Sequence, residues 1–558
     1  MTSSKFNYTF GSVLILIGIT VPSITLIKVL RGEPPIDIRQ QLLVGGTIFK
    51  IGLIIFGGIF LVRGRFSFFK LEKRPIEPLP DSKRKVTIII LATILLTAFV
   101  LRIYGLNNGL WYDEILTYVD FANTPFGEII TTFHSQNNHM LYSLLTHGSF
   151  LIFGESAWAL RLPAALFGVA SIWAVYLLGK QVSTTRESLL SAALLTFSYH
   201  HIWFSQNARG YSGLLFWSVF TSWLFVRGLR EGQSRIWLFY AVSASLGVYT
   251  NMTMLFVIIG HFIIYLLALV PYRKYLWPER SAGFYLGFCL TGLLTLQLFS
   301  LVLPQLFGNV AEEGGAVAVW RNPIWTLLEF VKGFEVGLIG AFSGVVCLFI
   351  IGIGIKSYVR ENPLVIQLLF IPVIAGAVVT IGMGHHLWPR FFFFSLGFAV
   401  IVVIRGIFVS GNIVSKLLRF EPERSGLIGT TLCVGVIIAS SFSIPGVYSP
   451  KQDFLGALSF VEKHKKPGDK VATVGMAMLP YAEYLKTDWE KAETIASLDS
   501  IRANSKRTWL IYTVPIHLQS FYPEILNTIN EDFKVIKQFY GTLGGGTIFV
   551  CRTDNLTS

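Results

Sequence analysis

The sequence predicts a polytopic α-helical membrane protein with about 13 transmembrane helices and a small C-terminal α/β domain. Of its 558 residues, 53% are hydrophobic and only 14% are charged, whereas a soluble globular chain carries about a quarter of charged residues. Apolar runs of about 20 residues, long enough to cross a ~30 Å hydrocarbon core, recur along the chain. A long polar stretch follows the last of these runs, and its alternating helix and strand patterns predict the α/β domain.

The apolar runs divide the chain into three regions. Residues 1–85 hold two extra N-terminal transmembrane helices and a proline-broken, basic cytoplasmic linker. Residues 86–446 form the main transmembrane module, which contains the long polar segment 107–156, and residues 447–558 form the soluble domain. The predicted spans are 9–30, 41–62, 86–106, 157–179, 187–205, 210–229, 235–250, 252–270, 281–303, 336–355, 364–383, 391–410 and 426–446.

Basic residues recur in every second loop, which predicts the orientation in the membrane. After the linker at 63–85, alternate loops carry Lys180 and Arg186, then Arg227, Arg230 and Arg235, then Arg273, Lys274 and Arg280, then Lys356 and Arg360, and finally Lys416, Arg419 and Arg424. The positive-inside rule then places the N-terminus in the cytoplasm, and segment 107–156 and the C-terminal domain outside the plasma (inner) membrane. The net charge of +14 belongs to these loops, so it does not indicate nucleic acid as a partner.

The polar tail shows its own alternation of elements. A helix is predicted at 453–465, strands at 470–475 and 509–514, a helix at 515–530, and a closing hairpin at 533–540 and 546–551. The glycine-rich turn 541–545 inside this hairpin is not a phosphate-binding loop, because no Gly-Lys-Ser/Thr sequence and no helix follow it.

Asp113 and Glu114 are the first candidate catalytic residues. They follow Trp111 and Tyr112 and lie a few residues beyond the span 86–106. A solvated pair of loop acids is the plainer interpretation, but Trp and Tyr are typical of the membrane interface. Burial at that boundary can raise a carboxylate pKa toward the range of a general base. We therefore predict that the pair catalyses a reaction or binds a substrate.

Other polar candidates lie in the same extracytoplasmic loops. They are His139 in segment 107–156, His201, Gln206 and Arg209 between two spans, and His385, His386 and Arg390 in a later turn. An arginine at a span end often only reaches for water, and His139 suits an interfacial hydrogen bond equally well. Two arginines beside two carboxylates, however, suit a phosphate leaving group opposite a general base.

A divalent metal stays an open alternative, and no cofactor is required by any pattern. The histidines outside the membrane could hold a metal ion, yet none has the HExxH spacing. The four cysteines form no CxxC pair, so neither a disulfide nor a thiolate site is expected.

Arg102 and Arg161 flank the carboxylate segment, and either could be an ion-pair partner that holds it in place, which is the interpretation that we prefer. Glu312 and Glu313 lie in a Gly-rich outer loop, which is either a mobile lid or simply a solvated loop.

Several motifs taken together resemble the membrane-embedded GT-C glycosyltransferases. The closest likeness is to glycosyltransferase family 39, the dolichyl-phosphate-mannose protein mannosyltransferases, and to the bacterial aminoarabinose transferase of lipid A. The matching segments are 101–106 (LRIYGL) with 110–114 (LWYDE), 155–168 (ESAWALRLPAALFG), 203–212 (WFSQNARGYS) and 389–391 (PRF). Each motif alone is weak, whereas their combination and order between residues 86 and 410 are specific.

This resemblance implies an enzyme that moves a hexose or pentose from a polyprenyl-phosphate carrier to an acceptor outside the cytoplasm. Asp113 matches the family's base, Glu114 would orient or bind, and Arg209 and Arg390 would meet the carrier phosphate. Many members have a histidine followed by two prolines where this chain has His139-Met140-Leu141, so the role of His139 is open. The acceptor could be a lipid, a protein or a polysaccharide.

Two rival functions fit the same composition. A transporter or lipid flippase would need a polar path through the membrane, but few ionisable residues lie deep in the predicted spans, Lys50 being the main one. A glycan polymerase or ligase would also use outer loops and arginines. The position of Asp113 separates the classes. In a transferase it should face a cavity that has Arg209 or Arg390 opposite and that opens laterally to lipid, whereas in a flippase that cavity should continue to the cytoplasmic side.

Overall fold

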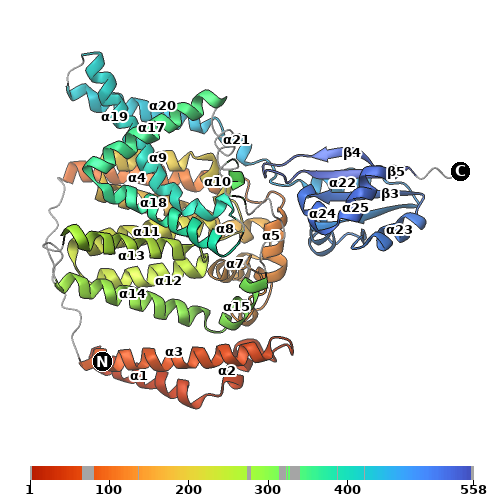
Figure 1. Cartoon of the computed structure of the whole chain (residues 1–558), viewed down its shortest axis with the longest axis horizontal. Coiled ribbons are helices and arrows are strands. Elements are labelled where there is room, and N and C mark those ends of the chain that lie inside the picture. Colours follow the sequence, from red (N-terminus) through yellow and green to blue (C-terminus); the bar gives the residue numbers. More distant parts are fainter. Residues whose placement is uncertain are drawn as a thin grey trace.

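The computed structural model is mostly helical, with one small sheet near the C-terminus (Figure 1). The apolar helices form one body, and the sheet with its helices lies to one side of it. The structure describes residues 3–65, 81–135, 137–272, 278–312, 322, 324–326, 328, 340–385, 387–419 and 422–554.

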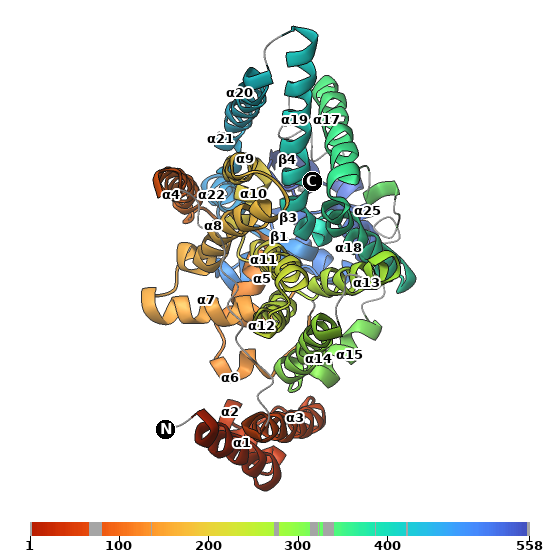
Figure 2. The same ribbon diagram turned by 90° about the vertical axis from the view of Figure 1, so that its left-hand side faces the viewer.

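The N-terminal region differs from the prediction of two straight spans. The run 9–30 forms two helices, α1 (Ser3–Thr20) and α2 (Ser23–Arg31), whose axes differ by 105°. Pro22 lies at the break, and a proline has no N–H to continue the hydrogen bonds of α1. The second run forms α3 (Arg39–Arg65), which packs along α1 at the edge of the molecule (Figure 2).

The main module contains a helix for each apolar run between 86 and 446. The helices are α4 (Asp81–Ile103), α7 (Met140–Phe153), α8 (Ala157–Val182), α9 (Thr185–Thr196), α10 (Tyr199–Ser205), α11 (Tyr211–Glu231), α12 (Ser234–Thr250), α13 (Met254–Tyr272), α14 (Pro278–Phe299), α15 (Leu303–Glu312), α17 (Gly340–Glu361), α18 (Pro363–Gly382), α19 (Leu396–Leu417) and α20 (Pro422–Ser441). The run 187–205 is split into α9 and α10, because the Ser198 hydroxyl accepts a hydrogen bond from the His201 N–H and starts a new helix.

The number of spans is smaller by a strict criterion of length and hydropathy. Within the described residues, seven helices are long and apolar enough to cross a membrane, or eight if the bent α1–α2 pair is one span. Three shorter apolar helices, of 10–17 residues, accompany them. The fold is that of a multi-pass membrane protein, whereas the predicted count of 13 is not confirmed.

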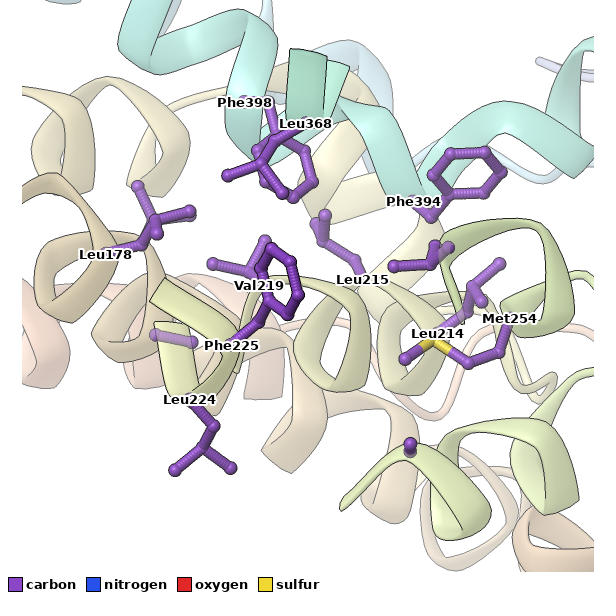
Figure 3. Close-up of a cluster of buried hydrophobic side chains, with 14 of the residues drawn as sticks. Leu178, Leu214, Leu215, Val219, Leu224, Phe225, Met254, Leu368, Phe394 and Phe398 are labelled. Carbon is purple, nitrogen blue, oxygen red and sulfur yellow. The ribbon is translucent and has the colours of Figure 1, made fainter. Parts of the chain in front are cut away.

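The centre of the module is packed around α11. Leu214, Leu215 and Val219 of this helix are fully buried and face Phe394 and Phe398 (Figure 3). In a bilayer, where lipid tails are as apolar as these side chains, close van der Waals packing rather than removal from water stabilises such a core. This packing fixes α11 against the segment 389–398. Arg209 lies just before α11, and Arg390 lies at the start of that segment.

Segment 107–156 is a chain of short helices. It contains α5 (Tyr112–Thr117), a π-helical turn at Tyr118–Ala122, and α6 (Phe126–Ile129), followed by α7. The Arg31 guanidinium donates to the Thr131 and Thr132 hydroxyls at 3.2 and 3.0 Å, which ties the N-terminal helices to this segment.

The C-terminal unit confirms the predicted mixture of helices and strands. Its elements are α22 (Phe454–His464), β1 (Asp469–Thr473), β2 (Glu490–Lys491), α23 (Ile495–Ala503), β3 (Arg507–Thr513), α24 (Pro515–Phe521), α25 (Pro523–Asp532), β4 (Lys534–Phe539) and β5 (Ile548–Asp554). The strand order is β2-β1-β3-β5-β4, with β1 parallel to β2 and β3 and with β5 antiparallel to β3 and β4. The predicted helix 515–530 is two helices, because Pro523 interrupts it.

Candidate active site

Glu114 is a buried anchor of the carboxylate segment. Its side chain is fully buried and accepts hydrogen bonds from Arg161 at 2.7 and 2.5 Å and from the Ala208 N–H at 2.7 Å. It also closes the first turn of α5 by accepting from the Trp111 N–H. Burial alone would raise the pKa of Glu114, but these donors and the charge of Arg161 hold it below its usual value. Glu114 is therefore ionised and fully occupied.

Asp113, its neighbour, faces two arginines from distant parts of the chain. Its side chain is 13% exposed. Oδ2 of Asp113 accepts from Arg209 Nη1 and lies 3.4 Å from Nη1 of Arg390. Three elements meet here: the first turn of α5, the turn that precedes α11, and the 3₁₀ helix Pro389–Ser395 that precedes α19. The structure thus brings together the predicted acid and both predicted arginines.

His139 orients Arg209. Its Nε2 lies 3.2 Å from both Nε and Nη2 of Arg209, and its Nδ1 lies 3.1 Å from the Thr250 carbonyl oxygen. Burial lowers the pKa of His139 to about 4, so the ring is neutral, with Nδ1–H donating to Thr250 and Nε2 accepting from Arg209. A side chain at Gly210 would lie 2.6 Å from the Thr250 carbonyl oxygen and 3.1 Å from the His139 ring, so only glycine fits there.

The Arg390 guanidinium packs on an aromatic ring, and the side chain is partly exposed. Its guanidinium lies 4.8 Å above the Trp388 ring, which contacts Trp325 in turn. The side chain is 28% exposed, against 5% for Arg209. Among the described residues, Nε of Arg390 has no hydrogen-bond partner. Arg209 stays charged as well, because burial lowers its pKa only to about 10. The site therefore carries one carboxylate and two guanidinium groups.

Other predicted site residues lie behind this cluster or apart from it. Gln206 uses its amide to hold the carbonyls of Arg102 and Tyr104 at 3.2 and 2.5 Å. His201 is fully buried, with its ring nitrogens 2.5 Å from Arg102 and 2.8 Å from the Ser171 hydroxyl. His385 is half-buried, and its backbone N–H donates to the Thr380 carbonyl. His386 and the Glu312 and Glu313 side chains lie outside the described residues.

The expected roles of Arg102 and Arg161 separate in the structure. Arg161 pairs with Glu114 as predicted. Arg102 is not the ion-pair partner, because its guanidinium binds His201 and the carbonyls of Ala98, Leu195 and Thr196 instead of a carboxylate. It joins α4 to the break between α9 and α10, where helix-terminal carbonyls lack partners.

The site has no visible set of metal ligands. Over the part of the chain that the structure describes, no three His, Cys, Asp or Glu side chains come together as a metal-binding group. The groups that surround Asp113 are cations.

Lys451 and Gln452 reach the same region and were missed by the sequence analysis. Lys451 Nζ donates to the Gln206 carbonyl at 2.6 Å, and Gln452 Oε1 accepts from the Tyr112 N–H at 3.0 Å. Both are almost fully buried. The only signal in the sequence is their position just after the last predicted span, at the start of a polar stretch whose side chains would be expected to face solvent.

The comparisons with known proteins agree with the motifs in the middle of the chain. Residues 138–304 match the dolichyl-phosphate-mannose-protein mannosyltransferase family. The resemblance to these membrane glycosyltransferases is therefore confirmed there, in a range that includes His139 and Arg209. Asp113 and Arg390 lie outside it.

One relative and two solved structures are also similar. YkcB of Bacillus subtilis (strain 168), a protein provisionally named as a mannosyltransferase, is 24% identical over 203 residues; the match covers 33% of this chain and 27% of YkcB, about a quarter of its length. The Archaeoglobus fulgidus oligosaccharyltransferase, in complex with Zn and sulfate, is 12% identical, with a TM-score of 0.49 over 82% of this chain and 72% of that chain. ArnT from Cupriavidus metallidurans, bound to undecaprenyl phosphate, is 12% identical, with a TM-score of 0.47 over 83% of this chain and 97% of that chain.

Proposed function

We propose that this protein is a GT-C-type membrane glycosyltransferase that moves a sugar from a polyprenyl-phosphate donor to an acceptor on the extracytoplasmic side of the plasma membrane. The observation that carries the proposal is the placement of Asp113 between Arg209 and Arg390. The family match over residues 138–304 supports the same reaction class. The N-terminus is cytoplasmic in this proposal, and the C-terminal unit lies outside, as the basic loops predict.

The two arginines would receive the donor phosphate. Guanidinium groups bind phosphate oxygens in fixed geometry, and a buried guanidinium stabilises the charge that develops on a leaving group. A phosphate bound there would compete with Asp113 for Arg209 and Arg390. Donor binding would thus release the Asp113 carboxylate, which is a weak base while it is paired with two cations.

Asp113 would then act as the general base. The acceptor hydroxyl oxygen attacks the anomeric carbon, its proton passes to Asp113, and the bond from that carbon to the phosphate oxygen breaks. The electron pair of that bond stays on the polyprenyl phosphate, held by the two arginines. Attack opposite the leaving group inverts the anomeric centre. No metal is required in this scheme because the arginines supply the positive charge. The transferred sugar is a hexose or a pentose, and the acceptor a lipid, protein or polysaccharide.

The test is transfer from a radiolabelled polyprenyl-phosphate sugar by protein reconstituted in liposomes. Asp113→Asn should lower the release of polyprenyl phosphate by about 10³-fold, within the range for loss of a general base. Asp120→Asn, in the π-helical turn of the same segment, should leave it unchanged and serves as the control. An active Asp113→Asn protein would overturn the assignment of the base. A wild-type protein that moves the intact donor between leaflets without releasing sugar would favour a flippase.

A further inference from the structure

Lys451 holds the turn that carries Arg209 toward Asp113. Its Nζ donates to the carbonyl of Gln206, the residue that begins this turn, at 2.6 Å, and lies 5.1 Å from the Trp203 ring centre. The next residue but one, Ala208, donates its N–H to Glu114. The position of the Arg209 backbone is therefore fixed on one side by Glu114 and on the other by Lys451.

Gln452 holds the other partner of the ion pair. Its Oε1 accepts from the N–H of Tyr112, the residue directly before Asp113, at 3.0 Å. Its Nε2 donates to the hydroxyl of Thr513 at 3.2 Å, and Thr513 is the last residue of β3. Two consecutive residues of the C-terminal unit thus form hydrogen bonds with the two backbone segments that carry Asp113 and Arg209.

The turn 541–546 of the C-terminal unit holds Lys451 and Gln452 in place. The N–H groups of Thr542 and Leu543 donate to the carbonyls of Pro450 and Lys451 at 2.9 and 3.1 Å. A side chain at Gly541 would lie 2.0 Å from the Lys451 carbonyl oxygen, so this approach requires glycine. The Trp203 indole N–H donates to the Thr542 hydroxyl at 2.9 Å and joins the turn to α10.

Burying the ammonium group of Lys451 costs free energy, so space filling alone does not explain this side chain. The residue is 7% exposed, and among the described residues the Gln206 carbonyl is the one hydrogen-bond partner of its ammonium group. An ammonium group has three donors and loses much hydration when it is buried. Burial lowers the pKa of Lys451 to about 7, although the charge of Glu114 raises it.

We propose that Lys451 and Gln452 are positioning residues that set the separation of Asp113 and Arg209, and that the C-terminal unit is consequently part of the active site. The catalytic side of this inference rests on the proposed transferase function. The structural side does not, because the two residues contact the backbone of the site whatever reaction occurs there.

The first experiment compares Lys451→Met and Lys451→Arg in the full-length protein, with exposed Lys463→Met as the matched control. Lys451→Met should lower kcat by about 10–100-fold, with the donor KM within about threefold of wild type, because a shift of about 1 Å in a catalytic group costs about 10²-fold. Lys451→Arg should recover most of the rate, since a guanidinium can donate to the same carbonyl. The proposal is overturned if Lys451→Met turns over normally.

The pH profile separates positioning from simple stability. Glu114 of α5 and Arg161 of α8 are the charged groups that face Lys451. Because Lys451 is protonated below a pH of about 7 and neutral above it, its bond to Gln206 weakens as the pH rises through that value. The rate of Lys451→Arg relative to wild type should therefore rise between about pH 6 and 9. A constant ratio contradicts the role assigned to the charge.

The second experiment reads the contact without catalysis, by hydrogen exchange of residues 110–116. Gln452→Leu should speed exchange of the Tyr112 N–H, which loses its acceptor, whereas exposed Gln519→Leu should not. Unchanged exchange in Gln452→Leu would overturn the proposal even if Lys451→Met proved unstable. Faster exchange in a protein whose wild type transfers no sugar would retain the positioning contact and reject the transferase function.

Discussion

Two clusters of arginine and carboxylate groups lie near opposite ends of α8. One has a carboxylate between two arginines, and the other has an arginine between two carboxylates. Near its start, Asp113 lies between Arg209 and Arg390. Just beyond its end, Arg405 lies between Glu187 and Glu361, at 2.9 Å from the former and paired directly with the latter. Because α8 has 26 residues, its axis is about 39 Å long.

The difference in charge explains why one cluster suits a reaction and the other suits structure. Arg405 is surrounded by two carboxylates and by the Ser357 hydroxyl, so its donors are occupied and the group has a net charge of −1. The Asp113 cluster has a net charge of +1, and within the described part of the chain Nε of Arg390 has no hydrogen-bond partner. An excess guanidinium beside an accessible carboxylate attracts an anion, whereas a saturated arginine only joins α9, α17 and α19.

The sharpest test of this comparison replaces one arginine in each cluster, the buried Arg209 and the partly exposed Arg405. Arg209→Ala should lower kcat/KM for the polyprenyl-phosphate sugar by about 10²–10³-fold, because a buried group that stabilises the leaving phosphate is lost. Arg405→Ala should leave kcat/KM within about threefold and lower the melting temperature instead. Donor turnover and thermal unfolding of the same two preparations provide the measurement. Equal losses of turnover would remove the distinction between the clusters.

A second, smaller effect is expected at Arg390. Arg390→Ala should raise the donor KM by roughly 10–100-fold, since a hydrogen bond to a charged group is worth about 1.5–3 kcal/mol. Arg390→Lys should recover part of the affinity, because it keeps the charge but not the two-pronged geometry. Initial rates at varied donor and fixed acceptor would show the change. A rise in the acceptor KM alone would assign Arg390 to the acceptor side.

The smallest expected effect is a shift in thermal stability. Undecaprenyl phosphate at about 100 times its Kd should raise the melting temperature of wild type by roughly 2–5 °C, because a ligand stabilises the state that binds it. Arg405→Ala should show the same rise in melting temperature, although its melting temperature without ligand is lower. Arg390→Ala should lose most of this rise. Loss of the shift in Arg405→Ala would mean that the distant cluster also contributes to binding.

The reach of the sequence analysis follows from the range of the interactions involved. Helices at the apolar runs and an ion pair between an arginine and the carboxylate segment were predictable, because hydropathy and loop charge are local signals. The loop charges also predicted that Asp113, Arg209 and Arg390 lie on the same side of the membrane. Which of the two acids would be saturated was not, since that depends on the Ala208 N–H and on Arg161 reaching Glu114 rather than Asp113.

The errors come from contacts between distant segments. Arg102 has the same sequence signal as Arg161, an arginine near a span end, but its partners are carbonyls exposed by the break before α10. His201 lies behind this arginine rather than at the site. Lys451 and Gln452 gave no signal, because their burial depends on the turn 541–546 about 90 residues later in the chain.

The outermost strand of the C-terminal sheet bears on how closely copies of this protein can be crowded. Among the strands that the structure describes, β4 pairs only with β5, and its register shifts between Val535 and Lys537. An open strand edge offers unpaired N–H and C=O groups on which another chain can add a strand, and bulges and lysines prevent this. Lys534 and Lys537 are exposed on this bulged edge. Neighbouring molecules can therefore reach high density in a bilayer without their sheets fusing into a continuous fibre.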